Sequence, residues 1–223
     1  MGHRFAEIAF TPGVKQVQET LGSRRSYARL EGGDTHHDQL GPSEAAFIAA
    51  RDSFYLASVS ETGWPYIQHR GGPPGFLRVL DESHIGFANL AGNRQYISVG
   101  NLAHNARVAL FLMDYPNRTR LKLLGRARLV GSDDTATMTR LRGAGQSGRV
   151  ERGIVIAVAA FDWNCPQHIT PRFTPAEFAA ASPPLRQAGR TNCHPPATKQ
   201  TRQPVRACKD SSLPASAVAR RAI

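Results

Sequence analysis

The sequence predicts a mainly β protein in which antiparallel strands form a closed or partly closed barrel with peripheral helices. Short apolar segments follow one another between residues 54 and 163. Most of them are joined by short, polar turns, and segments with helical periodicity are few. Many strands in sequence with few helices favour a barrel over a parallel sheet, because parallel neighbours need a long crossover connection.

Two helical segments precede the strands. Residues 11–22 place Pro12 in the first turn and gather valines and Leu21 on one side. Residues 42–52 form the second segment, with Ser43 as the expected N-cap. We therefore expect an N-terminal helical arm over residues 1–41, followed by a barrel domain over residues 42–182.

The strands are recognised by runs of apolar residues bounded by turn residues. Thr62 and Gly63 suit a hairpin turn, whereas the GGPPG stretch at 71–75 interrupts the pattern because proline cannot donate to a ladder. Two further helical segments are expected at 133–142 and at 174–181, the latter with a capping box of Thr174 and Glu177. The predicted strands are 54–60, 66–70, 76–80, 85–90, 106–114, 119–130 and 153–163.

Residues 183–223 differ from the rest in composition. They are rich in Pro, Ser, Thr, Ala and Arg and lack apolar periodicity, so we expect a basic, disordered tail. From residue 184 onward, eight Lys and Arg face one acid, so the tail supplies +7 of the net charge of +11 and leaves +4 elsewhere. That balance suits a small anionic ligand better than nucleic acid, which ranks last as a partner.

Several classes of protein and site are not expected. No apolar run approaches the roughly 18 residues of a membrane helix, and the N-terminus does not resemble a signal peptide. The three cysteines are too few and too scattered for a disulfide framework, and Cys193, His194 and Cys208 lack a fourth metal ligand. We expect a cytoplasmic protein with no membrane partner and no metal.

Polar side chains crowd the segment after the strand at 85–90. Gly92, Asn93, Arg94, Gln95 and Ser98 follow one another within seven residues. Such groups either form a solvated turn or hold a phosphate, and a helix beginning near residue 93 would add its N-terminal amides.

Two cations lie on one face of the strand at 119–130. Arg120 and Lys122 point the same way because side chains alternate along a strand. They either face solvent, as most Lys and Arg do, or converge with Arg94 on one anion if the polar loop folds nearby.

The last strand ends in a second polar group. Trp163, Asn164, Gln167 and His168 follow the apolar strand directly. They suit either a structural corner around a buried Trp or donors to the carbonyls of a heterocycle. Cys165 precedes a proline and has no obvious activating base, and we identify no catalytic residue.

Residues 42–172 together resemble the FMN-binding split-barrel family related to pyridoxamine 5′-phosphate oxidase. The segments that resemble the family are HRGGPPGF at 69–76, FANLAGNRQ at 87–95, TRLKLLG at 119–125 and NCPQHI at 164–169. The first and last resemble a subgroup described as flavin-nucleotide-binding proteins. The resemblance implies a split, Greek-key antiparallel barrel and a homodimer with the flavin at its interface.

The resemblance also implies a cofactor site. The loop residues at 93–95 would grip the phosphate, Arg120 would contact the flavin with Lys122 beside it, and the strand at 75–80 would run along the ring. Gln167 or His168 would reach across the dimer interface. The implied cofactor-binding residues are Arg70, Gly75, Phe76, Asn89, Asn93, Arg94, Gln95, Ser98, Arg120, Lys122, Trp163, Gln167 and His168.

The expected function is an FMN-dependent oxidoreductase that acts with a small-molecule substrate or reductant. FMN ranks ahead of a deazaflavin or FAD. Gln95 stands where the oxidases often carry Lys, and residues 173–223 do not resemble the oxidases' substrate-binding end. This leaves a second interpretation open, namely a flavin carrier, storage or sensor module without turnover.

Overall fold

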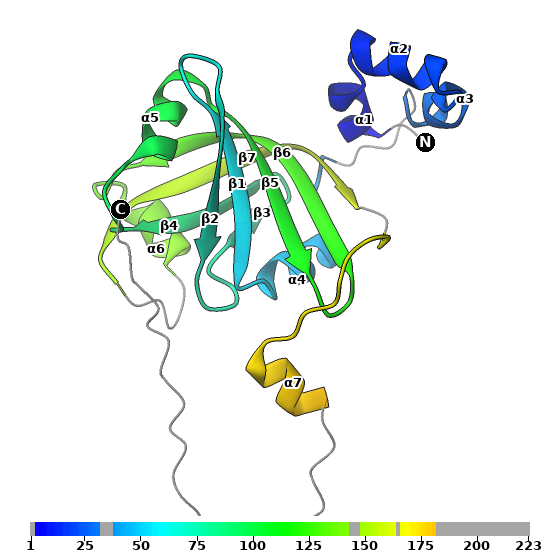
Figure 1. Cartoon of the computed structure of the whole chain (residues 1–223). Helices are drawn as coiled ribbons and strands as arrows, with labels where there is room; N and C mark the ends of the chain where they lie inside the picture. Colours follow the sequence, from blue (N-terminus) through cyan, green and yellow to red (C-terminus); the bar gives the residue numbers. More distant parts are fainter. Residues whose placement is uncertain (1–2, 32–37, 143–147, 164–165, 182–223) are drawn as a thin grey trace, which may run out of the picture. The chain divides into compact units, whose positions relative to one another are not determined.

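The computed structural model describes residues 3–31, 38–142, 148–163 and 166–181 (Figure 1). All of them belong to one unit, Met1–Ala181. The tail predicted over residues 183–223 lies outside the described residues, as do Asn164 and Cys165. Among the residues that the structure describes, no helix is long and apolar enough to cross a membrane.

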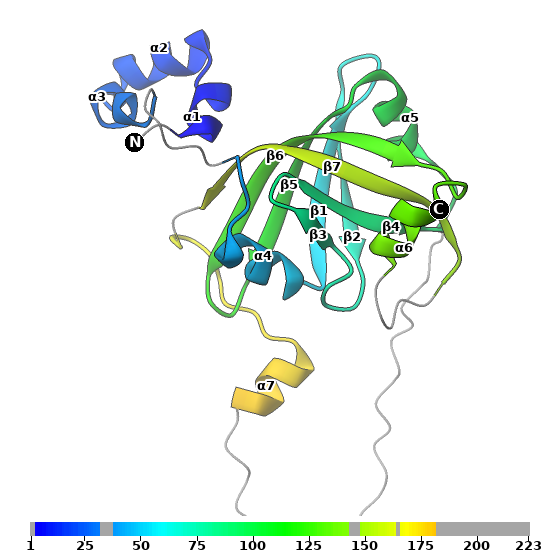
Figure 2. The same cartoon turned by 180° about the vertical axis from the view of Figure 1, so that it is seen from behind.

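Seven strands form a single sheet in the order β2-β1-β5-β6-β7-β4-β3, and every pairing is antiparallel. This confirms the predicted fold class. Because β2 and β3 lie at the two ends of this order, the curled sheet does not close by a ladder (Figures 1 and 2). The strands are β1 Ser53–Val59, β2 Pro65–Gly71, β3 Arg78–Asp81, β4 His84–Leu90, β5 Arg107–Asp114, β6 Thr119–Val130 and β7 Val150–Trp163.

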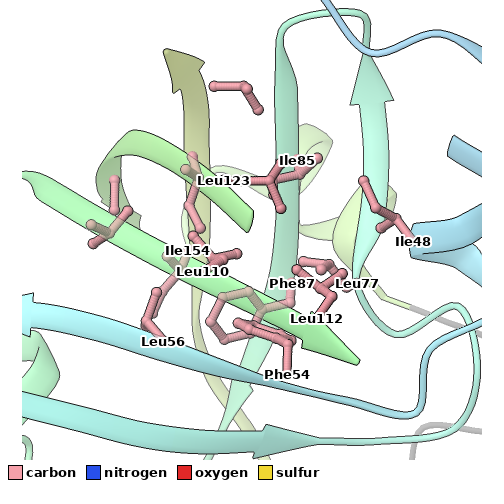
Figure 3. Packing of buried hydrophobic residues seen from close by; sticks show 14 of the residues in the cluster. Ile48, Phe54, Leu56, Leu77, Ile85, Phe87, Leu110, Leu112, Leu123 and Ile154 are labelled. Atoms are coloured by element: carbon pink, nitrogen blue, oxygen red, sulfur yellow. The ribbon is translucent and has the colours of Figure 1, made fainter. Parts of the chain in front are cut away.

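Alternation along the strands fills the inside of the barrel with apolar side chains. On β5 and β6, Leu110, Leu112, Leu121 and Leu123 are all buried, whereas their neighbours in sequence are partly exposed (Figure 3). Each such side chain contributes about 1.5–3 kcal/mol by leaving water. A packed interior of this kind leaves the rim and the outer face of the sheet for ligands.

Three aromatic side chains, from β1, β4 and the segment before β3, pack against one another in the core of the barrel. The ring of Phe54 stacks on Phe76 at 5.7 Å and meets Phe87 edge-on at 5.3 Å. Gly72 permits this packing, because a Cβ on Gly72 would lie 2.7 Å from the Phe76 ring. The GGPPG stretch predicted to interrupt the strands therefore ends β2 at Gly71 and turns the chain over this cluster.

The helices lie outside the sheet. The predicted segments correspond to α2, α4, α6 and α7, and the expected capping box is present because Thr174 and Glu177 exchange hydrogen bonds. Ser43 is not the N-cap of α4, because Gly41 precedes Pro42 there and donates its N–H to Glu44. The helices are α1 Arg4–Ala9, α2 Pro12–Thr20, α3 Arg24–Tyr27, η1 Ala28–Leu30, α4 Pro42–Ala49, α5 Ile97–His104, α6 Thr135–Leu141 and α7 Pro175–Ala181.

Candidate functional site

Two pockets adjoin each other where β2 passes β4. The loop pocket, which is open to solvent, is lined by Tyr66, Gln68, Arg70, Asn89, Leu90, Gly92, Asn93, Arg94, Gln95, Tyr96, Ile97, Ser98, Val99 and Glu151. The strand pocket is lined by His69, Arg70, Gly71, Phe76, Phe87, Ala88, Asn89 and Leu90. The two pockets share Arg70, Asn89 and Leu90 as a common wall. Six of the predicted site residues therefore line the loop pocket, and Phe76 lines the strand pocket. The six are Arg70, Asn89, Asn93, Arg94, Gln95 and Ser98.

The loop from residue 91 to 96 is held in a strained conformation. Arg94 and Tyr96 both have positive φ angles, 61° and 55°, which side-chain-bearing residues rarely adopt. Asn93 Oδ1 accepts a hydrogen bond from the Gln95 N–H at 3.3 Å. The Arg94 Nε donates to the Tyr96 hydroxyl at 3.4 Å, and that hydroxyl donates to Glu151 at 3.2 Å. The bond to Tyr96 and the nearby carboxylate raise the pKa of Arg94, which therefore stays charged.

Helix α5 starts later than expected, at Ile97 instead of near Asn93. Its buried Ser98 donates a hydrogen bond to the Gln68 side chain at 2.8 Å, and Asn101 donates to Ser58 at 3.0 Å. These bonds fix the helix against β1 and β2, so that its first turn lines the loop pocket. The Ser98 hydroxyl proton is thereby committed to Gln68, and the backbone N–H groups of the first turn, which have no partner within the helix, point toward its N-terminus.

The shared wall is built by Arg70. Its Nη1 donates to Asn89 Oδ1 at 2.9 Å, and its guanidinium lies 5.7 Å from the centre of the Phe87 ring. The Arg70 Nε is buried without a hydrogen-bond partner, and burial lowers the pKa of Arg70. Leaving a buried donor unpaired costs about 1–3 kcal/mol.

The strand pocket has an aromatic lining beside this cation. Phe76 and Phe87 are almost fully buried and form its floor. Gly75 lines neither pocket; its φ of +82° makes the turn that leads into Phe76 and β3. The strand pocket thus has one guanidinium at its edge, above two aromatic rings that the protein itself covers almost completely.

Trp163 is a structural residue at the other end of β7. Its indole N–H donates to Glu44 at 2.8 Å, and its ring meets Phe47 edge-on at 4.8 Å. The structure therefore supports the interpretation as a structural corner, which ties β7 to α4. Gln167 and His168 are exposed in the turn that follows, with His168 at a φ of 61°.

Arg120 and Lys122 do not join the loop pocket. Lys122 Nζ pairs with Asp162 at 2.6 Å and lies 4.8 Å from the Phe5 ring centre, and Arg120 lies over Phe111. Asp162 stands eleven residues along β7 from Glu151 of the loop pocket, a separation of roughly 35 Å at the usual rise of a strand. The prediction that these cations converge with Arg94 within one chain is therefore wrong.

Two charged residues at the start of β7, Glu151 and Arg152, belong to the loop pocket or its surroundings and are not among the residues predicted from sequence. Glu151 is the one carboxylate among its lining residues, all of which the structure describes. Arg152 pairs with Glu151 at 3.3 Å, lies 5.1 Å from the Tyr96 ring centre, and has a buried Nε without a partner. Glu151 and Arg152 belong to the charged VERG stretch that begins β7, whereas the predicted strand begins only at residue 153, where its apolar part starts.

Comparison with known proteins agrees with this architecture. The family model described as pyridoxamine 5′-phosphate oxidase matches residues 40–157, slightly more than half of the chain. The chain belongs to the pyridoxamine 5′-phosphate oxidase family. The range that matches the family contains every residue lining the two pockets, from Tyr66 to Glu151, and stops before Trp163.

Solved structures similar to this family member include three bacterial proteins. HupZ of Group A Streptococcus is 14% identical, with 60% of this chain and 99% of that chain covered and a TM-score of 0.46. The Clostridium acetobutylicum protein related to general stress protein 26 is 14% identical, with 60% and 94% covered and a TM-score of 0.41. General stress protein 26 of Bacillus anthracis is 13% identical, with 58% and 92% covered and a TM-score of 0.41. No curated protein matches the sequence.

Proposed function

We propose that this family member binds FMN across the loop pocket and the strand pocket and works as a flavin-dependent oxidoreductase in the cytoplasm, on a small molecule yet to be identified. The observation that carries the proposal is the wall of Arg70 and Asn89, which the cationic loop pocket shares with the strand pocket. FMN has the matching form, a phosphate at one end of the molecule and a flat ring at the other.

The charges of the loop pocket favour a phosphate monoester. Arg70 and Arg94 line it and Arg152 stands behind Tyr96, whereas Glu151 is its one carboxylate. The resulting two positive charges balance a phosphate that carries close to two negative ones.

When bound, FMN supplies hydride transfer through its ring. In this proposal Arg94 and the amides at the start of α5 hold the phosphate, while Phe76 and Phe87 keep water from one side of the ring. Arg70 places a fixed positive charge beside the ring, which favours the reduced, anionic form. The chain's own contribution is therefore binding, exclusion of water and electrostatic tuning.

A second copy of the chain is part of the proposal. The outer face of β1, β2, β5 and β6 carries an apolar groove, in which Tyr55 and Ile67 are 40% and 66% exposed. Arg120 and Lys122 flank this face, and the Arg120 Nε is buried without a partner. A two-fold dimer through this face would bring the Arg120 end of one chain to the pockets of its partner, so that residues distant within one chain would meet.

Subunit exchange tests both parts of the proposal. Arg94→Ala and Arg120→Ala should each lose FMN, because each removes a charge-assisted contact worth about 1.5–3 kcal/mol. If the two residues serve one site from different chains, mixing the variants and allowing their subunits to exchange restores roughly a quarter of the sites, since half of the randomly paired dimers carry one intact site. Arg107→Ala, an exposed arginine on β5, is the matched control.

The outcomes separate the two parts. Full FMN retention by Arg94→Ala would contradict the phosphate site. Loss of FMN by both variants without recovery on mixing would contradict the site shared between chains.

A non-catalytic carrier is the second candidate. It is favoured by the segment after β7, where residues 170–180 are all exposed and form no wall against either pocket. Anaerobic mixing of the FMN-loaded protein with NADPH or NADH distinguishes the two. Bleaching of the flavin faster than free FMN supports the oxidoreductase, and no bleaching with either reductant supports the carrier.

A further inference from the structure

Tyr96 adopts a backbone conformation that tyrosine seldom takes. Its φ is 55°, and its carbonyl accepts the N–H of Gly100 at 2.8 Å where helix α5 begins. Glycine and asparagine usually fill such a left-handed position, because larger side chains are strained there. Backbone strain of this kind persists only where the surrounding structure holds it, and it is concentrated at functional sites. The strain therefore indicates that this position requires the Tyr96 side chain.

The side chain of Tyr96 is held by two residues at the start of β7. The Arg152 guanidinium lies 5.1 Å from the centre of the Tyr96 ring, and the Tyr96 hydroxyl donates to Glu151 Oε1 at 3.2 Å. Arg152 pairs with the other carboxylate oxygen, Glu151 Oε2, at 3.3 Å. The register of the β4–β7 ladder shifts between Asn89 and Leu90, which makes Glu151 the extra residue of a β-bulge. A bulge changes the direction of a side chain, and here two consecutive residues of one strand both contact Tyr96.

The Tyr96 hydroxyl connects this support to Arg94. It accepts a hydrogen bond from Arg94 Nε at 3.4 Å while it donates to Glu151, so its proton and one of its lone pairs are both used. Within the described part of the chain, the two Nη groups of Arg94 have no hydrogen-bond partner. Because the guanidinium is planar and rigid, a bond at Nε fixes the direction in which the two Nη groups point.

Arg94 needs such support because it lies in an exposed loop. A long side chain in this setting moves freely, and immobilising it when a ligand binds lowers the affinity. A hydrogen bond that orders the side chain before the ligand arrives removes part of this cost. The Nη groups that remain form the two parallel donors with which arginine binds a phosphate.

We propose that Tyr96 is a positioning residue of the loop pocket, which holds Arg94 so that its Nη groups meet the phosphate of the flavin. This rests on the proposed function, in which Arg94 binds that phosphate. Tyr96 acts on the one part of FMN that riboflavin lacks. It therefore contributes to selectivity for the phosphorylated flavin and leaves the affinity for riboflavin unchanged.

The test measures the Kd of FMN and of riboflavin by flavin fluorescence for the wild type, Tyr96→Phe and Tyr27→Phe. Phenylalanine keeps the ring beside Arg152 and removes the hydroxyl alone. We expect Tyr96→Phe to bind FMN about two- to tenfold more weakly, as for the loss of one hydrogen bond, and to bind riboflavin as the wild type does. Tyr27 is an exposed tyrosine on α3 that lines neither pocket, so Tyr27→Phe should match the wild type for both ligands.

A double-mutant cycle separates an action through Arg94 from a direct contact of Tyr96 with the phosphate. In the Arg94→Ala background, Tyr96→Phe should not change the Kd of FMN further, because no guanidinium is left to hold. An equal loss with and without Arg94 would overturn the positioning role. The same conclusion would follow from wild-type FMN affinity in Tyr96→Phe, or from an equal loss for riboflavin. A wild type that does not prefer FMN to riboflavin would instead overturn the proposed phosphate site.

Discussion

Replacing Arg70 by methionine separates cofactor binding from folding. Methionine replaces the apolar stem of the arginine side chain as far as Nε and can pack on Phe87, but it removes the guanidinium that forms the shared wall. The loss of the charged hydrogen bond to Asn89 costs about 1.5–3 kcal/mol. Against this, the buried and unpaired Nε of Arg70 no longer has to be desolvated, a relief of about 1–3 kcal/mol. The two contributions nearly cancel, so we expect the unfolding free energy of the apoprotein to change by less than about 1.5 kcal/mol.

The affinity for FMN has no such compensation. Arg70 would lose its contact with the ligand, worth about 1.5–3 kcal/mol, which corresponds to a roughly 10- to 150-fold rise in Kd. Urea unfolding of the apoprotein and titration of FMN fluorescence measure the two quantities, with Arg78→Met on β3 as the control because Arg78 is exposed and lines neither pocket. Wild-type affinity in Arg70→Met would refute the placement of the ligand. A loss of more than about 3 kcal/mol of apoprotein stability would instead show that Arg70 is needed for the fold.

Three further variants test other parts of the molecule. Trp163→Phe should lower the unfolding free energy by about 1.5–3 kcal/mol, measured by urea titration, because its hydrogen bond to the carboxylate of α4 is lost, and should leave the Kd for FMN unchanged. Burial would raise the pKa of Asp114, but hydrogen bonds from Asn117 and the charge of Arg51 lower this pKa overall. Asp114→Asn should therefore lower the unfolding free energy at pH 7, and the difference from the wild type should disappear as the pH falls through the lowered pKa. A difference that persists in acid would contradict this. Glu151→Gln keeps a hydrogen-bond acceptor and removes the one carboxylate of the loop pocket, so FMN should bind up to about tenfold more tightly; weaker binding in a fluorescence titration would disprove this electrostatic account.

The strands could be predicted from sequence because their signal is local. β6 has the predicted bounds, and alternation of apolar and polar residues along it is enough to find them. β7 starts three residues before the prediction, since Arg152 and its neighbours are charged and the pattern of an apolar strand begins only at Gly153. A charged residue on a strand is acceptable here because the neighbouring pocket hydrates or pairs it.

The candidate site could be predicted only where it is contiguous. Asn93, Arg94 and Gln95 lie in one loop, and the structure brings Arg70 and Asn89 to them across the split. The distance from this loop to Lys122 depends instead on the length and register of β7, which no local pattern encodes. Trp163 was ambiguous for the same reason, because its hydrogen-bond partner Glu44 is 119 residues away in sequence.

The way in which the edge strand β2 is held affects how it can move. Along most of the sheet, strands are joined by continuous ladders, whereas the free edge of β2 is fastened by the side-chain bonds of Gln68 to Ser98 and Arg70 to Asn89. Such side-chain bonds open at a lower cost than a ladder, so β2 can separate from β4 and α5 while β1 stays paired with β5. Arg70 both joins β2 to β4 and lines the two pockets. A ligand that binds Arg70 would therefore hold β2 in place, and amide hydrogen exchange along β2 would become slower when the ligand binds.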